Sequence, residues 1–124
     1  MNNQPNLEVE AVFAATVTLF KNAGFQVSMG SNSVTDYGHS RYMYVNYNNA
    51  LSWNIGLGAQ IRVSDHCTGD RRILNGDESF IMVSNAEANL AQVFHKFNYF
   101  FKPSEYAVTE KEVSAMVTKT NVQI

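Results

Sequence analysis

Apolar residues recur at helical spacing near the start of the chain. Asn6 precedes this segment and is a good helix N-cap, and Gly24 stands just past its end, where a left-handed residue commonly closes a helix. One stripe at this spacing contains Val9, Phe13, Val17 and Phe20. The pattern predicts a helix over residues 7–23 that packs its apolar face on a sheet.

Two further helices are predicted in the last third of the chain. Ser84 and Glu87 have the spacing of a capping box, and Pro103 follows where a helix should stop. The stripe between them consists of Leu90, Phe94, Phe97 and Phe101. Thr109 and Glu112 repeat the capping-box spacing before a shorter apolar pattern, which predicts a third helix there.

Between the helical segments the apolar period changes from 3.6 to 2, which is typical of half-buried strands. Residues 30–40 are mostly small and polar and are predicted to form a loop. The predicted strands are residues 25–29, 41–47, 51–55, 60–64 and 80–83. Short connections favour antiparallel pairing, so we expect an α+β fold. It would have a small antiparallel sheet of about four to five strands, with the N-terminal helix and one or two C-terminal helices on one face.

Length and charge limit the classes of function. The 124 residues form a single domain, 1–124. Only 16% of them are charged, against roughly 25% in an average soluble domain, so much of the surface is uncharged. A homodimer is one common use of such a surface. The net charge of −2 argues against nonspecific binding to nucleic acid, which requires an excess of basic groups.

The single cysteine excludes an internal disulfide and favours a reducing, cytoplasmic setting. No apolar run approaches the roughly 18–20 residues that span a bilayer, so we expect no membrane association. The first residues lack the basic start and apolar segment of a signal peptide.

A polar segment that follows residue 64 contains most of the candidate chemistry. Several side chains here are of the types that bind zinc, namely Asp65, His66 and Cys67, with His39 upstream and Asp70 nearby. Adjacent residues on a strand point to opposite faces, so His66 can share a metal site with both Asp65 and Cys67 only if the chain turns sharply there. Cys67 with His39 or His95 has the composition of a nucleophile–base pair, with Asp65 to orient the imidazole. In the alternative reading the Asp and His side chains only hold the next turn through backbone hydrogen bonds.

Arginines and tyrosines lie near this segment in the sequence. Arg62, Arg71 and Arg72, with Arg41, can bind a phosphate or a partner carboxylate in a bidentate manner, or can form surface ion pairs with nearby acidic residues. The aromatic residues of the middle of the chain are favoured interface anchors and are equally common in ordinary antiparallel sheets. They are Tyr37, Tyr42, Tyr44, Tyr47 and Trp53.

Two of these stretches, Tyr-Met-Tyr-Val at 42–45 and Ile-Arg-Val-Ser-Asp-His at 61–66, carry a resemblance. The chain resembles small accessory proteins encoded by phages and other mobile elements, including the anti-CRISPR class. The resemblance covers about a fifth of the chain and transfers no catalytic residue. It implies a protein made in the cytoplasm of an infected bacterium that disables a host defence by binding, or that captures a nucleotide signal.

The leading expectation is therefore a non-enzymatic protein that binds and inhibits a component of a bacterial defence system, without cofactor or metal. Its partner would be a host defence protein or complex. The expected contact residues are Arg62, Asp65, His66, Arg71 and Arg72, followed by Tyr42 and Tyr44. One alternative is a nucleotide-sequestering protein, with Arg71 and Arg72 on the phosphate and Trp53 or a tyrosine on the base. Another is an enzyme, either a small hydrolase or a metal-dependent nuclease, that uses His39, Asp65, His66 and Cys67.

Overall fold

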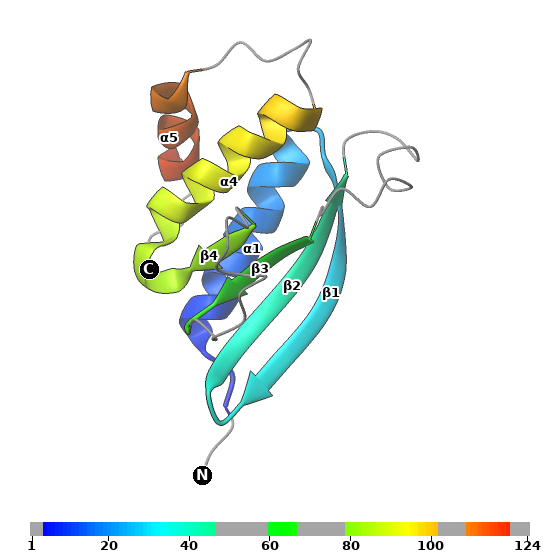
Figure 1. Ribbon diagram of the computed structural model, residues 1–124, viewed down its shortest axis with the longest axis vertical. Helices are drawn as coiled ribbons and strands as arrows, with labels where there is room; N and C mark the ends of the chain where they lie inside the picture. Colours follow the sequence, from blue (N-terminus) through cyan, green and yellow to red (C-terminus); the bar gives the residue numbers. More distant parts are fainter. Residues whose placement is uncertain (1–3, 47–59, 67–78, 102–108, 120–124) are drawn as a thin grey trace.

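Helices and strands follow one another in an order that confirms the α+β expectation. The computed structural model describes residues 4–46, 60–66, 79–101 and 109–119. Its elements are α1 (Leu7–Asn22), β1 (Gln26–Thr35), β2 (Gly38–Asn46), β3 (Gln60–Ser64), β4 (Phe80–Met82), the 3₁₀-helix η1 (Val83–Asn85), α4 (Ala86–Phe101) and α5 (Glu110–Lys119) (Figure 1). The predicted strand 51–55 lies outside the described residues.

The four strands form one sheet in the order β1-β2-β3-β4. β1 with β2 and β2 with β3 pair antiparallel, as expected. β3 and β4 pair in parallel, so the expectation of a wholly antiparallel sheet is wrong at this edge. Parallel neighbours need a connection of roughly a dozen residues or more, and residues 65–79 are long enough to provide one.

The predicted loop over residues 30–40 is also wrong. β1 continues to Thr35, Asp36 and Tyr37 form a two-residue turn, and β2 begins at Gly38. The polar composition misled the prediction because β1 lies at the edge of the sheet and most of its side chains are exposed. An exposed strand needs backbone pairing but little apolar periodicity.

A β-bulge interrupts the pairing of β1 with β2. Met29 pairs with Met43 and Asn32 pairs with Arg41, so two residues of β1 oppose Tyr42 alone. One of the two is Gly30, where an added Cβ would lie only 3.1 Å from the Tyr42 carbonyl oxygen. Glycine therefore permits the close approach of the two backbones at the bulge.

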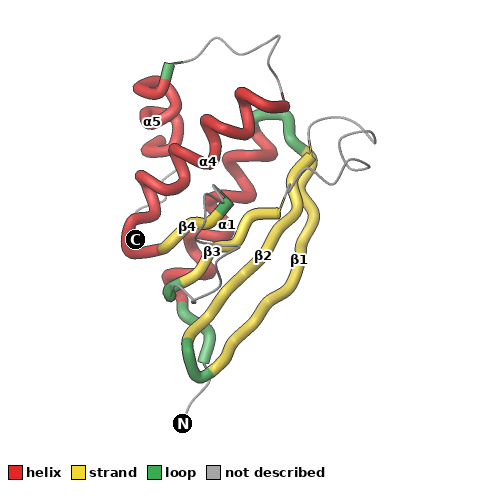
Figure 2. The backbone as a smooth tube through the Cα atoms, viewed as in Figure 1, coloured by secondary structure: helices red, strands yellow, loops and turns green. Residues whose placement is uncertain are grey.

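One face of the sheet packs on α1 and α4, and α5 packs on α4 (Figure 2). Alternate strand positions supply Met43, Val45, Ile61, Val63 and Ile81 to the core, and every one of them is fully buried. Phe20 of α1 makes edge-to-face contacts with Phe25, Phe94 and Phe97, with ring centroids 5.1–5.3 Å apart. The apolar stripes predicted from the sequence therefore meet in a single core.

Two of the predicted helix starts have the expected caps. The Asn6 side chain accepts hydrogen bonds from the backbone N–H groups of Glu8 and Val9 at the start of α1. Thr109 and Glu112 form a reciprocal capping box before α5, with hydrogen bonds of 2.7 and 3.2 Å. The segment predicted to cap α4 instead forms η1, and α4 begins at Ala86.

Among the described residues, none of the helices has both the length and the apolar character that a bilayer crossing requires.

Candidate functional site

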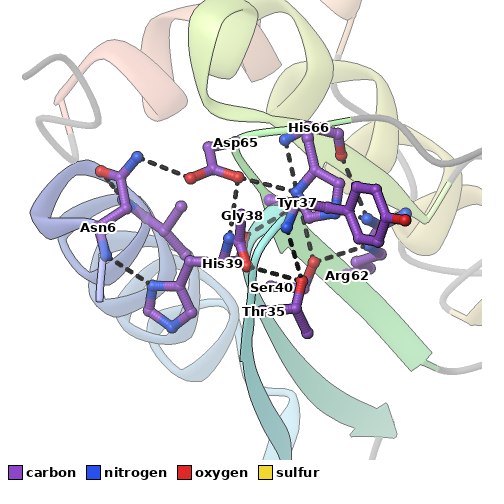
Figure 3. A network of polar contacts seen from close by, with 11 residues as sticks. Asn6, Thr35, Tyr37, Gly38, His39, Ser40, Arg62, Asp65 and His66 are labelled. Carbon is purple, nitrogen blue, oxygen red and sulfur yellow. Dashed lines mark hydrogen bonds and ion pairs between the residues drawn. The ribbon is translucent and has the colours of Figure 1, made fainter. Parts of the chain in front are cut away.

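The turn that follows β3 lies against the turn of the β1–β2 hairpin, at one end of the sheet (Figure 3). Gly38, which starts β2, has a φ of 144°, a conformation that favours glycine. A Cβ on Gly38 would collide with the Asp65 carboxylate and would lie 2.6 Å from Nδ1 of His66. The absence of a side chain at residue 38 therefore allows Asp65 and His66 to sit directly on the hairpin.

Asp65 is the centre of a hydrogen-bond network drawn from three separate parts of the chain. Its Oδ2 accepts a hydrogen bond from Nδ2 of Asn6 at 2.9 Å. Its Oδ1 accepts from the backbone N–H of His39 at 3.0 Å and lies 2.8 Å from Nδ1 of His66. Burial raises the pKa of Asp65, but the hydrogen bonds from His66, Asn6 and His39 lower it by more than burial raises it. The pKa of Asp65 therefore lies below its ordinary value of 3.8. The carboxylate is therefore held in its ionised form.

His66 is oriented by this carboxylate. An ionised Asp65 can only accept, so Nδ1 of His66 carries a proton, and in the neutral imidazole the lone pair is then on Nε2. Nε2 has no hydrogen-bond partner among the described residues, and the side chain is 22% exposed. The ring thus presents a fixed hydrogen-bond acceptor at the end of the sheet.

Ser64, His66 and Asp65 have the composition of a nucleophilic triad but not its geometry. Both the Ser64 hydroxyl, at 3.1 Å, and the Asp65 carboxylate, at 2.8 Å, contact the same imidazole nitrogen, Nδ1. A triad requires the serine and the carboxylate on opposite nitrogens, so that a proton can pass from one to the other. Ser64 is also fully buried, and its hydroxyl donates to the His39 carbonyl at 3.1 Å. These three residues therefore form no proton relay.

His39, a candidate ligand and base, is fully buried, and both ring nitrogens are occupied. Nδ1 accepts from the Asn6 backbone N–H at 2.9 Å, which places the ring proton on Nε2. Nε2 lies 2.7 Å from Oδ1 of Asn32 and 3.6 Å from a carboxylate oxygen of Glu10. His39 is therefore a structural residue, and in the part of the chain that is described no three His, Cys, Asp or Glu side chains cluster in a way that would hold a metal ion.

Arg62 was expected on an accessible contact surface, but the structure buries it. It is only 4% exposed, and its guanidinium lies 4.9 Å from the centre of the Phe80 ring. Nε donates to the Ser40 hydroxyl at 3.2 Å, and Nη2 donates to the Ser64 hydroxyl at 3.3 Å and to the His66 carbonyl at 3.2 Å. Arg62 therefore holds the backbone of the His66 turn in place from within the protein.

Arg41 lies on the helix-facing side of β2, whereas Arg62 of β3 points to the opposite side of the sheet. Arg41 forms an ion pair of 2.6 Å with Glu10 of α1, and its guanidinium lies 4.1 Å from the centre of the Phe13 ring. This geometry agrees with the ion-pair reading of Arg41, although the partner lies on α1 and not nearby in sequence. Arg41 connects the first helix to the sheet and adds nothing to the site.

Tyr42 and Tyr44 lie on the face of the sheet that points away from α1 and α4. Tyr42 is half-buried and is the cross-strand neighbour of Arg62. Tyr44 is exposed, and its hydroxyl accepts from Nε2 of Gln60 at 3.1 Å. The structure thus places both tyrosines on the strand that carries Gly38, some distance along it from the Asp65 turn.

Six other predicted residues lie outside the described residues: Tyr47, Cys67, Asp70, Arg71, Arg72 and Trp53. The nucleotide alternative depends on the last three, and the hydrolase alternative depends on Cys67. Both alternatives remain predictions from the sequence.

Two residues that the structure places here, Asn6 and Tyr37, were not among the contact residues expected from the sequence. Asn6 was expected only to cap α1, yet its side chain also donates to Asp65. Tyr37, one of the aromatic residues of the middle of the chain, lies next to Gly38 in the hairpin turn and is 84% exposed. The sequence Asp-Tyr-Gly at 36–38 after β-branched Val34 and Thr35 was a usable signal for a hairpin. We call Tyr37, Asp65 and His66 the hairpin-end surface.

Comparisons of the chain with protein-family models, with curated proteins and with solved structures found no match.

Proposed function

We propose that this protein is a non-enzymatic inhibitor of phage or mobile-element origin that binds a component of a bacterial defence system through the hairpin-end surface. The observation that carries the proposal is the fixed Asp65–His66 pair beside an almost fully exposed tyrosine. Nε2 of His66 has no partner among the described residues, so the surface offers an acceptor without an internal donor.

The chemistry of this surface suits recognition of another protein. Tyrosine contributes a large contact area and has few torsions to immobilise, which makes it a frequent centre of binding energy. The network around Asp65 fixes the imidazole before binding, so little conformational entropy is lost when the partner arrives. The complementary partner would present a hydrogen-bond donor to Nε2 and an apolar recess to Tyr37.

The non-enzymatic reading is supported by the shared use of Nδ1 of His66, which leaves Ser64 without a relay. The defence-related part of the proposal depends on the sequence resemblance at residues 42–45 and 61–66. The first stretch lies in β2, and the second covers most of the neighbouring strand β3 and the two residues that follow it, Asp65 and His66.

Phage plating on bacteria that each carry one defined defence system, CRISPR-Cas types included, tests the proposal. Expression of the wild-type protein should restore plaques on at least one host, and H66A and Y37A should lose this effect while remaining folded. Y99A is the matched control, because Tyr99 is an exposed tyrosine on α4. The proposal fails if no host is sensitised, or if H66A and Y37A sensitise as well as Y99A does.

The loss of affinity in each variant is measured with the purified protein and the purified component of the defence system that it inhibits. Each of H66A and Y37A should weaken the affinity by about tenfold or more, which corresponds to about 1.4 kcal/mol. Titration calorimetry or surface plasmon resonance measures this change, with Y99A expected to bind as the wild type does.

A further inference from the structure

β1 forms one edge of the sheet, and among the described residues it pairs with β2 alone. Along an edge strand, every second residue directs its backbone N–H and C=O away from the sheet. These groups are a ready template for another strand. β4, at the opposite edge, is only three residues long and offers a much shorter template.

β1 lacks most of the features that protect edge strands from pairing. Its ten residues contain no charged side chain and no proline. Lysine, proline and short length are common protective devices, and none of them is present in β1. The bulge that follows Met29 is the one protective feature that the described residues supply. The bulge limits regular pairing to the first part of the strand, residues 26–30.

The first part of β1 also exposes apolar surface. Met29 is 53% exposed, although it points to the same side of the sheet as the buried Met43 with which it pairs. Val27 is only half-buried on that side. On the other side, Ser28 is exposed next to the exposed Tyr44 of β2. An added strand would cover Met29 and Val27.

We propose that β1 pairs antiparallel with β1 of a second copy of this chain, about a twofold axis near Ser28. In this register Met29 lies opposite Val27 of the partner copy, so the exposed apolar side chains cover one another. The strand carries no charge, so self-pairing places no like charges opposite each other. The result is one continuous sheet across two subunits, with an isologous interface. This inference is independent of the proposed function.

Sedimentation velocity of the full chain over a range of micromolar concentrations tests the proposal. The wild type should be dimeric, and S28K should be monomeric because two lysines would meet at the axis. A14K adds the same charge at an exposed position of α1 and should remain dimeric. Circular dichroism should be unchanged, because Ser28 and Ala14 are both exposed.

A cysteine cross-link tests the register separately, in a background where Cys67 is replaced by serine. S28C places two thiols across the axis, at a separation of about 4.5–5.5 Å between Cα atoms, which suits a disulfide. T35C lies at the far end of the same strand and should not cross-link. A dimeric S28K or equal cross-linking of S28C and T35C would overturn the proposal. A monomeric wild type would also overturn it, even if a strand of another protein bound the edge.

Discussion

At the scale of single residues, the carboxylate of Asp65 connects parts of the protein that are distant in the chain. Its three donors come from Asn6 before α1, from His39 in β2 and from His66 in the next turn. Every donor favours the ionised form, and together they outweigh the effect of burial on the pKa of Asp65. The ionisation of this one group is therefore linked to the stability of the fold.

We expect D65N to reduce the free energy of unfolding at neutral pH, and the deficit to shrink in acid. Because the pKa of Asp65 in the folded protein lies below 3.8, the ionised carboxylate contributes its full stabilisation of the fold above about pH 3.8. It disappears as the pH falls from there through the folded pKa, and below that the wild type resembles the variant. Urea unfolding of both proteins from neutral pH down to about pH 2.5 measures the difference. A deficit that does not change with pH would contradict the linkage.

G38A should be destabilised by about 1–3 kcal/mol, because its φ is unfavourable for alanine and its Cβ would displace Asp65 and His66. Urea denaturation measures this loss in the free energy of unfolding. Y37A changes the neighbouring, exposed residue and should alter stability by less than about 0.5 kcal/mol. Equal stability of G38A and Y37A would mean that the hairpin and the turn after β3 are not in contact at Gly38.

At the scale of elements, the start of α1 shows how one side chain joins a helix to a sheet. Oδ1 of Asn6 accepts from the first turn of the helix, and Nδ2 donates to Asp65. The backbone N–H of the same residue donates to His39 in β2. The cap therefore fixes both the beginning of α1 and its position over the sheet.

Comparison of N6D with N6A separates these two roles. Aspartate caps helices as well as asparagine does, so a residue that only caps would tolerate N6D. We expect N6D to be destabilised, because its carboxylate would face the carboxylate of Asp65 without a donor between them. N6A should lose about 1–2 kcal/mol from the cap and the Asp65 contact together. If unfolding measurements show that N6D is as stable as the wild type, Asn6 acts only as the cap of α1, and its contact with Asp65 does not stabilise the fold.

At the scale of the whole molecule, a cluster of phenylalanines joins elements from both ends of the chain. Phe20 is fully buried and contacts Phe25 before β1 as well as Phe94 and Phe97 of α4. It therefore connects the N-terminal helix, the edge of the sheet and a C-terminal helix. Its removal affects the fold at several elements together.

F20A should be destabilised by about 3–5 kcal/mol, a large fraction of the stability of a domain of this size. Thermal unfolding followed by circular dichroism measures the loss. Y99A removes an exposed aromatic side chain from α4 and should unfold near the wild-type temperature. A small effect of F20A would contradict the central position of Phe20.

The sequence by itself determined the elements whose signals are local. The apolar stripe and Asn6 located α1, Thr109 and Glu112 located the start of α5, and the alternation around Ile61 and Val63 located β3. In each case the residues that form the element also carry its signal, either as a cap or as a period. The α+β class follows from the order of these elements.

Only the tertiary structure decided the second half of β1, the parallel pairing of β3 with β4, and the burial of His39 and Arg62. The donors and acceptors of both buried side chains include residues distant in the chain, such as Asn6 for His39 and Ser40 for Arg62. A polar residue is buried when such partners satisfy it, and no local pattern shows whether they will. The hairpin-end surface likewise exists because separate turns meet in space at Gly38, where the lack of a side chain leaves room for Asp65 and His66.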